Sequence, residues 1–142
     1  GKTLEGRIKL HLQVIQAVRE AVGKDFPVAL RLGACDYSEG GSTIDDAVLA
    51  SAAFERAGID LLDISGGLCG YINPYNKEQG YFCEISERIK KEVSIPVILT
   101  GGIVDIEKAE ALLSNKKADL IGVGRAILKD STWAQKAMTR AD

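Results

Sequence analysis

Apolar residues between Ile8 and Val22 recur every three or four positions. This spacing is the period of one face of a helix, and Gly23 is a typical stop signal after it. The same period returns later, and Thr43 with Asp46 three residues on resembles a capping box at a helix start. Further helices are expected over residues 43–58, 84–93, 105–114 and 132–138, with a short helical turn at 125–128.

Short apolar runs bounded by turn residues separate these helical segments, and such runs are typical of buried strands. They cover residues 28–33, 60–65, 96–100 and 118–124. Strands that alternate with helices form a parallel sheet with right-handed crossovers. Four such βα units are half of an eight-stranded barrel, and the same alternation also fits a small open doubly wound sheet.

Polar residues gather near the ends of these predicted strands, at Arg31, Asp63, Ser65 and Thr100. In parallel α/β folds the carboxyl ends of the strands are where ligands bind, so this edge is the expected site. Arg31 has two interpretations, because an arginine in an apolar strand needs a carboxylate or a ligand to compensate its charge. It forms an ion pair with Asp63 on the neighbouring strand, or it faces an electron-rich ligand.

Glycines end the last two predicted strands. Gly101 and Gly102 follow "PVILT", and Gly124 with Arg125 follows "LIGV". Glycine lets backbone N–H groups approach an anion such as a phosphate without a Cβ in the way, and an arginine adds a charge-assisted contact. These turns also fit ordinary strand-to-helix connections with Arg125 in solvent, but two of them in succession favour a phosphate site.

Residues 66–82 form a connection longer than most βα loops, and it holds three of the four tyrosines. Long loops are often lids or binding loops, but for any single tyrosine a surface loop anchored by its own aromatic residues is the favoured interpretation. We expect Trp133 in the core, and we expect His11 to be a helix-surface or packing residue rather than a base. The sequence contains no nucleophile–base pair that would indicate a catalytic centre.

Composition narrows the possible functions. The 142 residues, 46% hydrophobic and 27% charged, are typical of one soluble globular domain. A formal net charge of −2 gives no basic field for nucleic acid, and no apolar run approaches the roughly 20 residues of a membrane helix. Three cysteines without a C-x-x-C pair, and a single His, provide no metal-ligand spacing. We expect a reduced, cytoplasmic setting.

Several segments, in this order, resemble the carboxyl-terminal half of the old yellow enzyme family of NADH:flavin oxidoreductases. They are "GKTLEGRIKL", "FPVALRLGACDYSEGG", "GIDLLDISGG", "IPVILTGGI" and "ADLIGVGRAIL". The resemblance implies half of a (βα)8 TIM barrel, with residues 1–142 supplying strands five to eight of an FMN-binding domain. It implies that Arg31 contacts the flavin ring, that Gly101 and Gly102 with Gly124 and Arg125 hold the FMN phosphate, and that NAD(P)H is the reductant.

The resemblance also implies what the chain lacks. The family residues that hold the substrate carbonyl and donate a proton precede the matched segments, so no catalytic residue is expected in this chain, and the isolated fragment should be inactive. We expect a small-molecule substrate, the missing amino-terminal half-barrel as partner, and self-association of the fragment through the exposed sheet. Two alternatives remain: a flavin-independent barrel enzyme acting on phosphate esters, and a non-catalytic half-barrel module.

Overall fold

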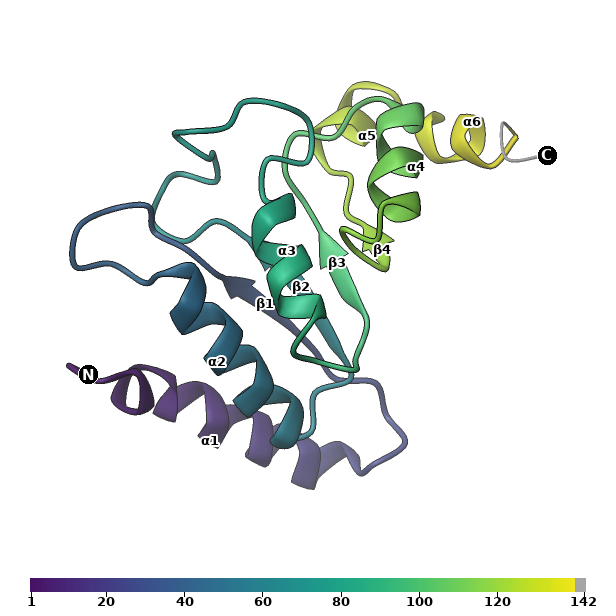
Figure 1. Cartoon of the computed structure of the whole chain (residues 1–142). Helices are drawn as coiled ribbons and strands as arrows, with labels where there is room; N and C mark the ends of the chain where they lie inside the picture. Colours follow the sequence, from purple (N-terminus) through teal and green to yellow (C-terminus); the bar gives the residue numbers. More distant parts are fainter. Residues whose placement is uncertain (140–142) are drawn as a thin grey trace.

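The computed structural model describes residues 1–139, which form a parallel sheet with helices packed on it (Figure 1). Each strand is followed by a helix, as the apolar spacing predicts. The elements, in order, are α1 (Leu4–Val22), β1 (Ala29–Gly33), α2 (Ile44–Arg56), β2 (Leu61–Ser65), α3 (Cys83–Lys90), β3 (Val97–Leu99), α4 (Ile106–Ser114), β4 (Leu120–Ile121), α5 (Arg125–Lys129) and α6 (Trp133–Thr139).

The sheet has the strand order β1-β2-β3-β4, with every neighbouring pair parallel. A doubly wound sheet reverses its strand order at a switch point, whereas a barrel adds its strands in sequence. The observed order is therefore that of half a barrel. Both edge strands, β1 and β4, have one side without a neighbouring strand among the described residues.

Burial alternates along the strands and separates the two faces of the sheet. Side chains on one face are apolar and pack against the helices. Four of them are fully buried: Leu62, Ile64, Val97 and Leu99. Side chains on the opposite face are polar or partly exposed, and they include Arg31, which lies in register with Asp63. Figure 1 shows α2 and α3 in front of the sheet. The face behind it corresponds to the interior of the barrel.

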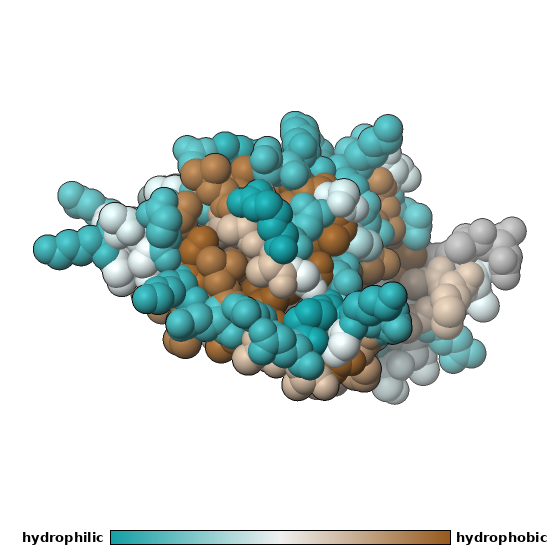
Figure 2. Space-filling model, turned by 90° about the horizontal axis from the view of Figure 1, so that it is seen from below, coloured by the Kyte–Doolittle hydropathy of each residue, from teal (hydrophilic) through white to brown (hydrophobic). Residues whose placement is uncertain are grey.

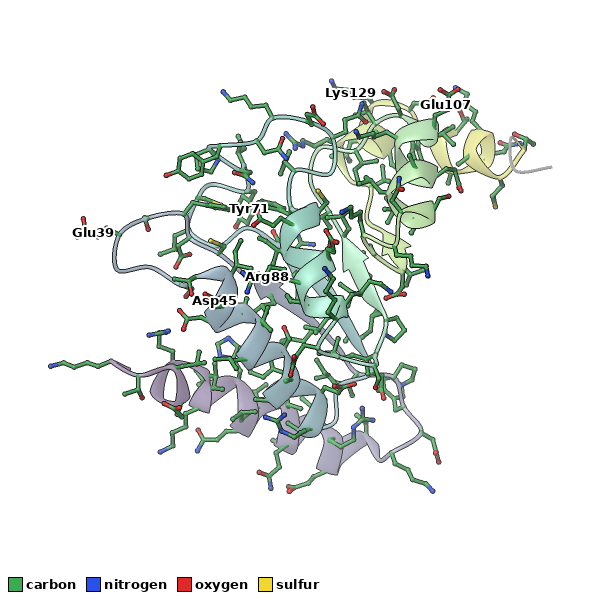
Figure 3. The ribbon with its side chains drawn as sticks, viewed as in Figure 1. Glu39, Asp45, Tyr71, Arg88, Glu107 and Lys129 are labelled. Atoms are coloured by element: carbon green, nitrogen blue, oxygen red, sulfur yellow. The ribbon has the colours of Figure 1, made fainter. Side chains whose placement is uncertain are left out.

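The core lies between the sheet and the helices. Phe54 of α2 and Ile85 and Ile89 of α3 are fully buried there, and each buried aliphatic or aromatic side chain contributes about 1.5–3 kcal/mol to folding. At the outer surface, Arg88 of α3 forms an ion pair with Asp45 at the start of α2; both are labelled in Figure 3. The two helices are therefore joined at the core and at the surface.

Three local predictions can be compared directly with the structure. The capping box is confirmed, because Thr43 accepts from the Asp46 N–H and Asp46 accepts from the Thr43 N–H, each at 3.1 Å. The strand expected at 118–124 contains only Leu120–Ile121. The expected core position of Trp133 is wrong: the residue is only partly buried, and its Nε1 donates to the Val104 carbonyl at 2.6 Å.

Helix α1 covers α2 and leaves apolar residues on its outer side. Figure 2, seen from the side on which α1 lies, shows hydrophobic residues gathered in the middle of this face and hydrophilic ones around them. The exposed apolar residues of α1 are Leu10, Val14, Val18 and Val22. No helix among residues 1–139 is both long enough and apolar enough to cross a membrane.

Candidate functional site

A cavity of about 1130 Å³ opens at the carboxyl ends of the strands. Strands β1 to β4, loop 66–82 after β2, and the connections after β3 and β4 contribute to its wall. Tyr71 and Lys129, which belong to the lining, lie toward the upper end of the molecule in Figure 3. The residues singled out in the sequence that line this cavity are Arg31, Asp63, Ser65, Thr100, Gly101, Gly102, Gly124 and Arg125.

Gly101 and Gly102 form a turn that requires glycine. Their φ values are +134° and +69°, a region that residues with a side chain rarely adopt. A Cβ would also lie only 3.0 Å from the Tyr81 ring at Gly101 and 2.6 Å from it at Gly102. Neither amide N–H donates a hydrogen bond to another residue among 1–139. The turn therefore offers donors to a ligand, and Tyr81 packs closely against it.

Arg125 begins α5, directly after Gly124, whose N–H also has no acceptor among the described residues. Arg125 Nη2 donates to the Tyr81 hydroxyl at 2.9 Å, and that hydroxyl donates to the Tyr71 carbonyl at 2.9 Å. The guanidinium carries five N–H donors, so this bond leaves others available. Gly101, Gly102, Gly124 and Arg125 thus place backbone and cationic donors on one cavity wall, as an anion site requires.

Arg31 and Asp63 form an ion pair across β1 and β2, with Nη1 and Oδ2 2.6 Å apart. The ion-pair interpretation of Arg31 is therefore confirmed. The side chain nevertheless remains 57% exposed on the cavity side of the sheet, so it also has room to contact a ligand. The second oxygen of Asp63, Oδ1, is buried and accepts no hydrogen bond from the described residues.

Loop 66–82 is anchored by one buried tyrosine and one buried asparagine. Tyr81 is 7% exposed, whereas Tyr71 and Tyr75 are 70% and 82% exposed. Asn73 donates to the Tyr37 hydroxyl at 3.1 Å and to the Tyr81 carbonyl at 2.8 Å, and it accepts from two loop amides. Asn73 was not expected from the sequence, since only its asparagine-proline step marked it as a turn residue.

The connection after β1 contains Asp36, which ties two loops together. Its carboxylate accepts the N–H groups of Ser42 and Leu68, both at 2.7 Å. These bonds, that from Leu68 above all, hold the pKa of Asp36 below its ordinary value. The loops after β1 and β2 are therefore held side by side at the rim of the sheet.

Two cysteines, Cys35 and Cys69, lie near this rim. Burial raises the pKa of Cys35, which disfavours the reactive thiolate. Cys69 Sγ lies 3.8 Å from the Cys35 carbonyl oxygen as a weak donor. Among residues 1–139, no group of three or more His, Cys, Asp or Glu side chains is placed to hold a metal ion.

Comparison with known proteins connects this geometry to one family. A model of the NADH:flavin oxidoreductase / NADH oxidase family matches residues 1–141. An NADH oxidase of Thermoanaerobacter brockii is 36% identical over 141 residues, which are 96% of this chain and 22% of that protein. An NADPH dehydrogenase of Clostridium acetobutylicum is 36% identical over 132 residues, which are 92% of this chain and 38% of that protein.

Solved structures share the fold. A 2-naphthoyl-CoA reductase complex superimposes with a TM-score of 0.86 at 23% identity, covering 99% of this chain and 22% of the other. The histamine dehydrogenase of Rhizobium sp. 4-9 gives a TM-score of 0.83 at 21% identity, with 99% and 21% covered. The chain therefore spans between about a fifth and two fifths of the length of these proteins. This coverage agrees with a half-barrel.

Proposed function

The chain belongs to the NADH:flavin oxidoreductase / NADH oxidase family, and from this premise we propose that it supplies the FMN phosphate site of an NAD(P)H-dependent oxidoreductase. Gly101, Gly102 and Gly124 would hold the phosphate through their amide N–H groups, and Arg125 through its guanidinium. Arg31 would face the flavin ring. The observation that carries the proposal is the set of unpaired donors on one cavity wall.

The residues fit a phosphate monoester in charge and in shape. Three glycine amides without acceptors and one guanidinium supply donors and a positive charge, which a dianionic phosphate requires. A Cβ at Gly101 or Gly102 would project toward Tyr81, so both amides depend on glycine for their positions. The cavity of about 1130 Å³ is large enough for a ligand of flavin size.

The ring side of the site is more open. Arg31 lies on the cavity face of the sheet, and Asp63 fixes it through the 2.6 Å ion pair. A fixed cation beside the ring position would favour electron-rich ligands and any negative charge that develops there.

When bound, FMN supplies hydride transfer from NAD(P)H to an acceptor. The residues of this chain bind and orient that cofactor; in this proposal they donate no proton to the substrate. The acceptor would be an activated alkene or a related compound, held mainly by the other half of the barrel. The isolated chain would therefore bind FMN but turn over no substrate.

A flavin titration tests the proposal, with riboflavin as the ligand that lacks only the phosphate. We expect the flavin fluorescence of FMN to be quenched at lower protein concentrations than that of riboflavin, because only the phosphate of FMN reaches the glycine amides and Arg125. Arg125→Ala should remove most of this preference, and Arg31→Ala should weaken the binding of both ligands. Arg56→Ala removes an equal charge from an exposed position outside the cavity and should change neither.

Other outcomes separate the alternatives. Binding of a sugar phosphate without binding of FMN would favour the flavin-independent phosphate-ester enzyme, since the same amides fit any phosphate monoester. Binding of neither ligand would favour a non-catalytic module. Equal affinity for FMN and riboflavin would contradict the assigned phosphate site.

A further inference from the structure

We propose that Tyr81 is a positioning residue of the phosphate site, which it connects to loop 66–82. It directs Arg125 toward the phosphate through its hydroxyl, and it supports the Gly101–Gly102 turn through its ring. This inference rests on the phosphate site proposed above. It adds a residue that would not touch the ligand itself, and it predicts that phosphate binding and loop order depend on each other.

The ring of Tyr81 is fixed on several sides. It packs edge-on against Phe82 with ring centroids 4.7 Å apart, and it fills the space that side chains at Gly101 and Gly102 would take. The backbone is tied to the same turn, because the Gly101 carbonyl accepts the N–H of Gly80 at 2.7 Å. A ring held in this way places its hydroxyl at one defined position.

The direction of the two hydroxyl bonds follows from proton counting. A tyrosine hydroxyl has one proton to donate. The Tyr71 carbonyl oxygen can only accept, so the proton goes to it, and the hydroxyl accepts from Arg125. The result is a chain of two bonds from the guanidinium through the hydroxyl to the backbone of the loop. Each bond in such a chain polarises the next and strengthens it.

This arrangement reduces the freedom of a long side chain. A free arginine loses roughly 2 kcal/mol of rotamer entropy when it is fixed on a ligand. Arg125 is already held by one of its five N–H donors, so less of that entropy remains to be lost on binding. The remaining donors can then meet the phosphate oxygens in pairs.

The second end of the chain lies in the loop. Tyr71 has a φ of +64°, a left-handed conformation that is costly for a residue with a side chain and persists where its surroundings hold it. The bond from the Tyr81 hydroxyl to its carbonyl is one such restraint. By linkage, a phosphate that fixes Arg125 also stabilises this part of the loop, and a fixed loop favours phosphate binding.

Tyr81→Phe tests the inference, because it removes the hydroxyl and keeps the ring on the glycines. In the 142-residue chain, we expect the affinity for FMN to fall by about three- to tenfold, as for the loss of one hydrogen bond, with the affinity for riboflavin unchanged. Tyr75→Phe removes an exposed hydroxyl from the same loop and should change neither affinity. A loss of affinity for FMN alone cannot come from general unfolding, because unfolding would weaken the binding of both ligands.

The combination with Arg125→Ala gives the decisive comparison. If the hydroxyl acts through Arg125, Tyr81→Phe should add almost nothing in the Arg125→Ala background. In a hydrogen-exchange experiment, FMN should slow the exchange of the amides of residues 70–73 in the wild type. In Tyr81→Phe it should leave their exchange rates unchanged. Additive losses, or equal protection in both proteins, would overturn the inference.

The two proposals fail in different ways. If Arg125→Ala leaves the preference for FMN over riboflavin intact, the phosphate site itself is wrong. If Arg125→Ala removes that preference and Tyr81→Phe does not change it, the phosphate site stands and the positioning role of Tyr81 is refuted.

Discussion

Gly102→Ala tests the close approach between the glycine turn and Tyr81. Gly102 has a φ of +69°, and an added Cβ would lie 2.6 Å from Tyr81 Cε1. The ring cannot easily move away, because Phe82 packs against it. Its hydroxyl also accepts a hydrogen bond from Arg125 and donates one to the Tyr71 carbonyl. The substitution should therefore cost both backbone conformational energy and packing energy.

The two costs can be estimated separately. A left-handed conformation costs an alanine roughly 1–2 kcal/mol, of which the reduced freedom of the unfolded chain returns about 0.4–1 kcal/mol. Forcing an extra carbon into a packed site adds roughly 1–3 kcal/mol. We therefore expect Gly102→Ala to lower the free energy of unfolding by roughly 2–4 kcal/mol.

Gly40→Ala is the matched control, since its φ is +72° and no atom lies within 4 Å of the added Cβ. It should cost roughly 1 kcal/mol, the backbone part alone. Urea denaturation followed by circular dichroism gives both values, with equal slopes required for the comparison. Equal losses at the two positions would refute the packing argument.

Three further results are expected. Asp36→Asn should lower the free energy of unfolding by about 1 kcal/mol at neutral pH, because the carboxylate accepts two backbone N–H groups. The pKa of Asp36 is lowered in the fold, so its contribution to stability is complete above its ordinary pKa and is lost as the pH falls. In urea titrations at lower pH the difference from wild type should therefore close. Asn73→Ala should cost roughly 2–3 kcal/mol in the same assay, because it leaves buried loop groups without partners, and Asn76→Ala should cost less. The exposed sheet edges and the half-exposed Leu120 should make the chain self-associate; a monomer at all concentrations in sedimentation would contradict this.

Local signals in the sequence predicted most of the fold. The capping box at Thr43 and the glycine stop at Gly23 act within one turn of helix, so they could be read without tertiary structure. The Arg31–Asp63 pair was also accessible, because neighbouring parallel strands place residues of one pattern in register. The strand at Leu120–Ile121 is shorter than expected, as glycines nearby weaken strand pairing.

Contacts between distant segments were not accessible. Nothing near Tyr81 in the sequence indicates that its ring packs on a glycine turn some 20 residues later or that Arg125 bonds its hydroxyl. Trp133 was expected in the core from its residue type alone. Instead, α6 packs against α5, and Trp133 donates to the Val104 carbonyl in the connection after β3. The sequence therefore predicts candidate residues that line one cavity, and the structure adds which residues hold them in place.

In the proposed site, the amides of Gly101, Gly102 and Gly124 hold the phosphate of FMN. Glycine amides are well separated in a ¹⁵N–¹H correlation spectrum, so a titration of the labelled chain tests each of them directly. We predict that FMN shifts these three resonances together and that riboflavin leaves them in place. Shifts confined to other residues, or equal shifts with both ligands, would contradict the account.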